Sequence, residues 1–319
     1  MNRNLSDTLN DPQEGVYFIG TTPPRAGTDD EKMAEIAGKL LARLSRLEYD
    51  GVIVYDIQDE SSRIEQPRPF PFMETRDPRE YSCLLSRLSG RETITYKSVA
   101  QRDRGSFEAW LQETHEKFSQ KHLVLVGAPS SNGQVHLSLN EAYDAFQNSG
   151  LPFNLGGVTI AERHATKGKE HLRLKQKTEQ GCSFFISQAV YNPQATIDLL
   201  TDYARECRLQ NKTPQRIILT FTPCGSEKTL AFMHWLGISV PAATGWRILD
   251  SESPLSESIR ICQNSLEQIL EACLPLGLPL GLNIESLTNR KEEIDASISL
   301  FRLLKATLEL RLAERAIAK

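Results

Sequence analysis

Most polar residues that could do chemistry here follow short apolar runs, where strands of a parallel sheet would end. Asp56 follows Val-Ile-Val-Tyr, Gln188 follows Phe-Phe-Ile-Ser, and Glu285 follows Leu-Gly-Leu-Asn-Ile. Other candidates of this kind are Thr21, Asp59, Glu60, Lys97, Ser130, Glu162, His164, Thr222, Asn283 and Arg290. The set mixes acids, bases and amides and shows neither a Ser-His-Asp order nor metal-ligand spacing. It favours binding of a polar heterocycle together with proton transfer, and we expect no metal.

The elements that must position these residues form a regular alternation of strands and helices. The expected strands are 16–20, 51–56, 93–96, 122–126, 157–161, 184–187, 216–221 and 280–284. Alternation of this kind implies parallel strands with right-handed crossovers, and eight units favour closure into a (βα)8 TIM barrel of the α/β class. The absence of Gly-x-Gly-x-x-Gly after the first run argues against a dinucleotide-binding fold. We expect a flexible N-terminus over 1–14 and a single βα-barrel catalytic domain over 15–319.

The totals exclude several classes of protein. A net charge of −4 argues against a nucleic-acid-binding surface as the main function. No apolar run approaches the ~20 residues that cross a bilayer, so no membrane partner is expected. The first residues are polar and lack a secretory signal, and the six cysteines are scattered. We expect a cytoplasmic protein with reduced thiols. The sequence leaves a homo-oligomer open.

One central stretch carries a family resemblance. It consists of Gly-Gly-Val-Thr-Ile-Ala-Glu-Arg-His ending at His164, Leu-Arg-Leu-Lys-Gln-Lys ending at Lys177, and Gly-Cys-Ser-Phe-Phe-Ile-Ser-Gln ending at Gln188. This pattern resembles the methylenetetrahydrofolate reductase superfamily. Thr-Pro-Pro-Arg at 22–25 and Leu-Thr-Asn-Arg at 287–290 extend the resemblance towards both ends of the chain.

The resemblance implies roles for individual residues. Gln188 matches the glutamine that holds the folate pterin, and Arg290 a substrate-contacting arginine. Lys97 and Asn283 complete the substrate-binding candidates by position. The cofactor-binding candidates are His164, near the flavin, Glu170 and Lys177, at its ribose and phosphates, and Tyr191.

Each of these residues also has a structural alternative. Gln188 could be satisfied by neighbouring backbone, and His164 could be a surface-loop histidine. Glu170 and Lys177 could belong to a solvated helix face, and Arg290 could lie in solvent at a helix start.

The sequence departs from the family at two positions that matter for chemistry. Gly20 occupies the place of the family's proton-donating glutamate, and Gly127-Ala128 stands where an aspartate faces the flavin. Glu285, Asp56 and Glu60 are therefore the candidate catalytic acids, although each could equally be a strand-end salt-bridge partner.

The expected function is that of a methylenetetrahydrofolate reductase-like oxidoreductase. It would reduce methylenetetrahydrofolate to methyltetrahydrofolate with NAD(P)H, and FAD binding stays open. Folate-dependent methyl transfer or demethylation, and folate binding without catalysis, are the alternatives.

Overall fold

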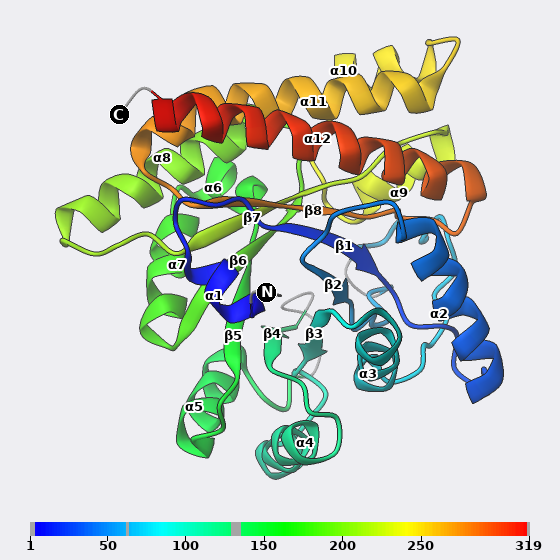
Figure 1. Ribbon diagram of the computed structural model, residues 1–319, viewed down its shortest axis with the longest axis vertical. Helices are drawn as coiled ribbons and strands as arrows, with labels where there is room; N and C mark the ends of the chain where they lie inside the picture. Colours follow the sequence, from blue (N-terminus) through cyan, green and yellow to red (C-terminus); the bar gives the residue numbers. More distant parts are fainter. Residues whose placement is uncertain (1–3, 62–63, 129–134, 318–319) are drawn as a thin grey trace. The chain divides into compact units, whose positions relative to one another are not determined.

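The computed structural model describes residues 4–61, 64–128 and 135–317, and eight parallel strands form a closed barrel in chain order (Figure 1). The predicted (βα)8 TIM barrel is confirmed. Ser130, one of the strand-end candidates, lies outside the described residues. The strands are β1 Tyr17–Thr21, β2 Gly51–Val54, β3 Glu92–Ser98, β4 His122–Val126, β5 Asn154–Thr159, β6 Cys182–Ala189, β7 Arg216–Phe221 and β8 Leu280–Ile284.

The strands form because their sequences suit burial on both faces. All residues of β2 (Gly-Val-Ile-Val) and of β7 (Arg-Ile-Ile-Leu-Thr-Phe) are buried, as expected for parallel strands covered by helices. Strands β7 and β8 pair in parallel from Ile217↔Leu280 to Phe221↔Ile284. Gly281 in β8 is needed for close approach, since a Cβ there would lie 2.9 Å from the carbonyl oxygen of Val16.

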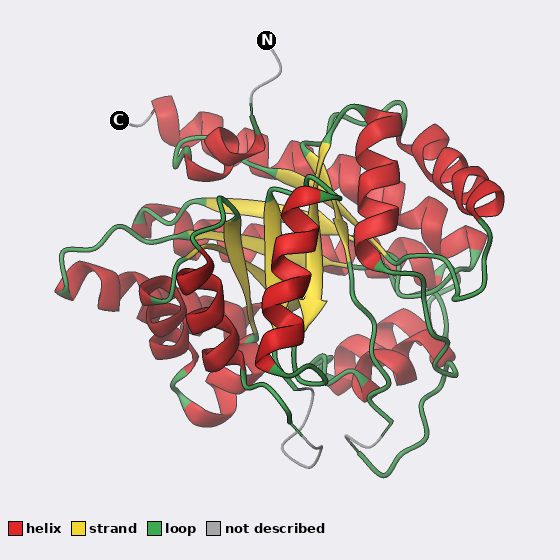
Figure 2. Ribbon diagram, turned by 90° about the horizontal axis from the view of Figure 1, so that it is seen from below, coloured by secondary structure: helices red, strands yellow, loops and turns green. Residues whose placement is uncertain are grey.

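The helices follow the strands and connect to them through loops (Figure 2). Before the fifth strand they are α1 Leu5–Asn10, α2 Asp30–Leu44, α3 Pro78–Ser89, α4 Arg104–Glu116 and α5 Leu139–Ser149. After it they are α6 Ala161–Lys167, α7 Glu170–Glu179, α8 Pro193–Leu209, α9 Glu227–Trp235, α10 Ala242–Leu249, α11 Pro254–Cys273, the 3-10 turn η1 Leu274–Leu276, and α12 Lys291–Ile317. In the described ranges, no helix combines the length and apolar character needed to cross a membrane.

The chain divides into two compact units. The first comprises the described residues of 1–18, 159–178 and 184–319, and the second comprises those of 19–158 and 179–183. Within the first unit, α11 and α12 pack side by side (Figure 1). Within the second, α4 packs on α5 and α3 on β3. The candidate site described below lies wholly within the first unit.

A short helix lies within the N-terminal segment 1–14, for which the sequence predicts flexibility. This helix is Leu5–Asn10, in which Leu5 and Leu9 are buried. The guanidinium of Arg216, 1% exposed, donates to the backbone carbonyls of five residues. These acceptors are Thr8, Leu9, Asp11, Glu14 and Leu280. A buried arginine thus ties the N-terminal segment to β7 and β8.

The largest local difference from the sequence prediction lies after β5. A strand was expected over 157–161 with Glu162, Arg163 and His164 at its end. The strand instead ends at Thr159, and these three residues belong to α6. Gly168, with φ 62°, closes this helix in the left-handed conformation. A seven-residue helix leaves too short a periodic pattern to be distinguished from a strand-end loop.

Candidate functional site

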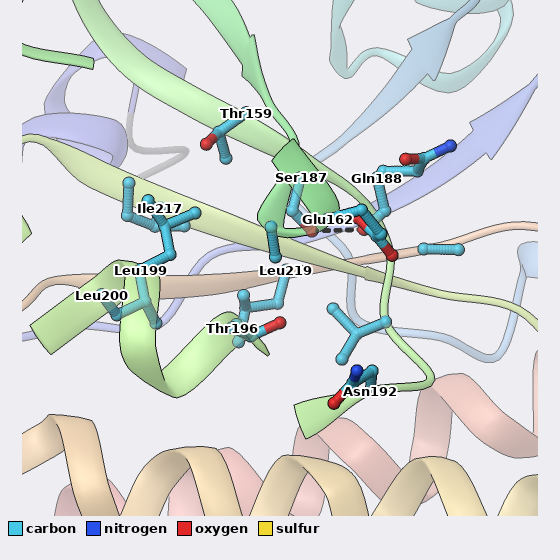
Figure 3. Close-up of a pocket in the computed structure, with 13 residues that line it drawn as sticks. Thr159, Glu162, Ser187, Gln188, Asn192, Thr196, Leu199, Leu200, Ile217 and Leu219 are labelled. Carbon is cyan, nitrogen blue, oxygen red and sulfur yellow. Dashed lines mark hydrogen bonds between the residues drawn. The ribbon is translucent and has the colours of Figure 1, made fainter. Parts of the chain in front are cut away.

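A pocket lies beside the C-terminal ends of β5 and β6, the first part of β7 and the first turns of α8 (Figure 3). It contains about 320 Å³ of space, partly open to solvent. Its apolar wall is formed by Leu199, Leu200, Ile217 and Leu219, and its polar wall by Thr159, Glu162, Ser187, Gln188 and Asn192. Figure 3 shows Glu162, Ser187 and Gln188 towards one end and Leu199, Leu200 and Ile217 towards the other. An apolar wall facing a few polar groups is the usual composition of a small-molecule site.

The end of β6 owes its shape to an irregularity in strand pairing. The register with β7 shifts between Ile186 and Ala189. The Ser187 hydroxyl accepts the Thr220 N–H at 2.9 Å and donates to the Gln188 carbonyl at 2.8 Å. Bulges of this kind re-aim side chains at the rims of barrels. The irregularity thus decides where the Gln188 side chain points.

Gln188 uses only part of its hydrogen-bonding capacity. Its Nε2 donates to the Leu236 carbonyl at 2.8 Å. Within the described residues, its Oε1 makes no hydrogen bond. The amide points away from Leu199 and Leu200 (Figure 3). The backbone therefore fixes the orientation of the amide, and its carbonyl oxygen and second N–H can pair with a ligand.

Glu162 is the acid of the pocket. It lies in the first turn of α6, and its Oε1 accepts the Ser239 N–H at 3.1 Å. Burial raises the pKa of the Glu162 carboxyl, and the hydrogen bond from Ser239 opposes this in part. A carboxyl group with a raised pKa beside a pocket is a candidate proton donor.

Thr159 brings a buried polar atom to the same pocket. The residue is 1% exposed, and its Oγ1 has no hydrogen-bond partner among the described residues. A buried hydroxyl without a hydrogen-bond partner is energetically unfavourable unless a ligand or a water molecule supplies that hydrogen bond. Asn192 is the N-cap residue of α8, and its side chain accepts the Ala195 N–H at 3.3 Å.

The other predicted substrate and acid residues of the first unit do not line this pocket. Asn283 is buried and donates to Thr220 Oγ1 at 3.2 Å, and Arg290 is exposed and donates to Ser226 Oγ at 3.2 Å. Glu285 is half-buried just beyond β8, and its N–H donates to the Phe221 carbonyl. Their roles in binding and catalysis stay predictions.

The candidate acids and base of the second unit have mainly structural contacts. Asp56 accepts from Lys97 Nζ at 3.0 Å, and the two side chains are 7% and 13% exposed. Asp56 also accepts from the Ser98 N–H and from Gln58. This is the strand-end salt bridge that the sequence left open. Glu60 is half-buried in the loop after β2.

The residues predicted for the flavin are mostly engaged within the protein. Glu170 is 2% exposed and accepts the Ile160 N–H at 3.2 Å, so it is not on a solvated helix face. Tyr191 is buried and donates to the Thr222 carbonyl at 2.7 Å, and His164 is buried against Asp202. Lys177 is half-buried on α7. Three of the four side chains therefore have partners within the protein, and their roles in binding a flavin stay predictions.

Sequence reasoning missed several residues of the pocket. Glu162 was placed among the strand-end polar groups but was not chosen as an acid, because its burial is a tertiary property. Thr159 was interpreted as an interior strand residue, and Asn192 gave only a helix-cap signal next to Pro193. Ser187 was expected in the strand, and no sequence signal indicated the register shift.

Comparison with known proteins adds one informative relative. No family model matches this chain. No curated protein matches it either. Among solved structures, an uncharacterized protein from Clostridium thermocellum that binds two copies of 5-methyl-5,6,7,8-tetrahydrofolic acid is 36% identical. The similarity covers 95% of this chain and 99% of that one, with a TM-score of 0.81.

Two more distant structures resemble the chain in fold alone. A GH113 beta-1,4-mannanase has a TM-score of 0.50 at 12% identity, covering 92% of this chain and 98% of its own. Apo-MsnO8 has a TM-score of 0.50 at 14% identity, covering 93% and 99%. At such identities the shared architecture carries no information on activity.

Proposed function

Because this chain belongs to the same family as the methyltetrahydrofolate-binding protein from Clostridium thermocellum, we propose that it binds a reduced folate of the 5-methyltetrahydrofolate type. The pterin ring would occupy the pocket beside Gln188. The family relationship over nearly the whole chain is the observation that carries this proposal.

The pocket chemistry supports a pterin. The edge of the pterin ring carries neighbouring donors and acceptors, and Gln188 can pair with such an edge through its Oε1 and its second N–H. The carboxylate of Glu162 can accept from an N–H of the ring.

Only the pterin ring would lie beside Gln188. The aminobenzoyl-glutamate tail would extend into solvent, where its carboxylates keep their hydration.

Calorimetric titration of the purified protein with 5-methyltetrahydrofolate tests the proposal. We expect saturable binding with micromolar or tighter affinity, and a thermal stabilisation that rises with ligand concentration. Binding of folic acid, which has an oxidised ring, should be weaker. Absence of heat and of thermal stabilisation at millimolar ligand would overturn the proposal.

A second candidate function is reduction of methylenetetrahydrofolate by NAD(P)H, as the superfamily resemblance implies. The raised pKa of Glu162 favours it, since the reaction needs a proton at the nitrogen that leaves the methylene carbon. The hydride of the nicotinamide would go to that carbon and convert it to a methyl group. Glu162 would thus act in place of Glu285, Asp56 or Glu60.

Nicotinamide oxidation separates the candidates. Oxidation of NADH or NADPH that depends on methylenetetrahydrofolate, and that is lost in Glu162→Gln, would support the reductase. Methyl-folate formation from a methyl donor without nicotinamide would indicate methyl transfer. Ligand stabilisation with no turnover in either assay would favour a folate-binding protein without catalysis.

A further inference from the structure

Two histidines and an aspartate meet on the first unit, and none of the three lines the pocket. They are His164 on α6, His171 on α7 and Asp202 on α8. One ligand atom from each residue lies within 4.8 Å of the others. No metal-type spacing is visible in the sequence, because three separate helices supply the three groups.

The distances suit an ion held between the side chains. His164 Nε2 lies 3.3 Å from Asp202 Oδ2. A charge-assisted hydrogen bond is usually shorter, at about 2.7–2.9 Å. Two ligands that each lie about 2.0–2.1 Å from a tetrahedral zinc ion are separated by roughly 3.3 Å. The pair is therefore already at the spacing of two metal ligands.

The ring nitrogens of the histidines also indicate a missing partner. His164 is 6% exposed, and the buried Nδ1 atoms of His164 and His171 have no hydrogen-bond partner among the described residues. The two rings are nearly perpendicular, at 82°, with centroids 5.3 Å apart. A buried imidazole nitrogen without a partner is unfavourable in a protein interior. Coordination of a cation by Nδ1 of His171 would give that nitrogen a partner, while His164 would bind the same cation through the Nε2 that faces Asp202.

We propose that His164, His171 and Asp202 bind a divalent transition-metal ion such as Zn²⁺. Imidazole and carboxylate ligands suit zinc and its neighbours rather than Ca²⁺ or Mg²⁺. The Asp202 side chain is 46% exposed, so a solvent molecule can complete the coordination. Small rotations of the half-exposed His171 and Asp202 would close the remaining distances.

The ion would join two elements that also shape the pocket. Helix α6 carries Glu162, and α8 carries Thr196 and Leu199. Helices α6 and α8 already contact each other in the fold. The bound ion would hold these helices and α7 together, which is a structural role that requires no folate.

Zinc titration of chelator-treated protein tests the site directly. We expect stoichiometric binding and a rise in Tm with Zn²⁺ concentration. His171→Ala and Asp202→Asn should each weaken Zn²⁺ binding by about 100-fold or more, since changes to outer-shell partners alone cost 10–100-fold. Both positions are only half-buried, so these variants should fold even if His164→Ala does not.

Two controls guard against adventitious zinc. His234→Ala removes an exposed histidine on α9, and Cys207→Ser removes a half-buried thiol on α8. Neither change should alter the affinity. Co²⁺ substitution should give a spectrum without thiolate charge-transfer bands. Equal Zn²⁺ affinity in wild type, His171→Ala and Asp202→Asn, or a thiolate spectrum, would overturn the proposal.

Discussion

The side-chain amide of Gln188 donates to the backbone carbonyl of Leu236 at 2.8 Å, across 48 residues of sequence. This bond joins the end of β6 to the turn after α9. Among the described residues, it leaves the amide oxygen without a hydrogen-bond partner. The sequence left two interpretations of Gln188 open, a glutamine satisfied by backbone and a ligand-binding glutamine. Its side chain is held by a backbone carbonyl, and it also lines a pocket.

Replacing Gln188 should weaken folate binding more than it weakens the fold. We expect Gln188→Ala to raise the Kd for 5-methyltetrahydrofolate about ten- to hundredfold, because the hydrogen bonds from the side-chain amide to the pterin are lost. This corresponds to a loss of ~1.4–2.8 kcal/mol in binding free energy. Gln112→Ala, which removes an exposed amide from α4, should leave the Kd unchanged. Calorimetry measures both. An unchanged Kd in a folded Gln188→Ala protein would place the pterin elsewhere.

Glu162 should make stability depend on pH in a defined direction. Burial raises its pKa, so the folded state binds the proton more tightly than the unfolded chain. The resulting stabilisation is fully present below the unfolded pKa of about 4.3 and is lost as pH rises through the folded pKa. Wild type should therefore lose stability relative to Glu162→Gln over this window.

Urea unfolding of wild type and Glu162→Gln across about pH 4–8 measures this effect. The glutamine keeps an acceptor for the Ser239 N–H, so the comparison isolates the proton. If the difference in the free energy of unfolding between the two proteins stays constant with pH, the Glu162 pKa is not raised.

Asp56 should matter for stability through its buried ion pair with Lys97. Removing one partner of such a pair costs ~3–5 kcal/mol, so Asp56→Asn should lower the free energy of unfolding by about that amount. Glu108→Gln breaks the exposed pair with Arg104 and should cost under ~1 kcal/mol. Chemical denaturation compares them. Loss of folate turnover in Asp56→Asn with unchanged stability would instead support its role as proton donor.

Arg216 should be a major determinant of stability although it takes part in no proposed chemistry. In Arg216→Met, buried carbonyls of the N-terminal segment and β8 lose their donor, at ~1–3 kcal/mol for each one that stays dry. We expect a loss of about 3–5 kcal/mol in urea unfolding and faster proteolysis within residues 4–14. Arg208→Met, on the exposed face of α8, serves as control and should behave like wild type.

The sequence alone determined the architecture, since barrel closure depends on local patterns repeated along the chain. Short apolar runs such as Gly51–Val54 and Arg216–Phe221 are typical of strands covered on both faces. Capped helices such as Pro78–Ser89 are predicted by Asp77, Pro78 and Gly90. The central motif also identified Gln188, because that residue lies inside the matched pattern.

Only the tertiary structure decided which polar residues meet. The burial that raises the Glu162 pKa, the ion pair of Asp56 with Lys97, and the approach of His164 and His171 to Asp202 all join residues from different elements. In the sequence, Arg216 is an ordinary residue at the start of a strand. Only the fold brings the N-terminal segment to its guanidinium. Such contacts depend on distances between elements, whereas sequence spacing reports only on neighbours within one element.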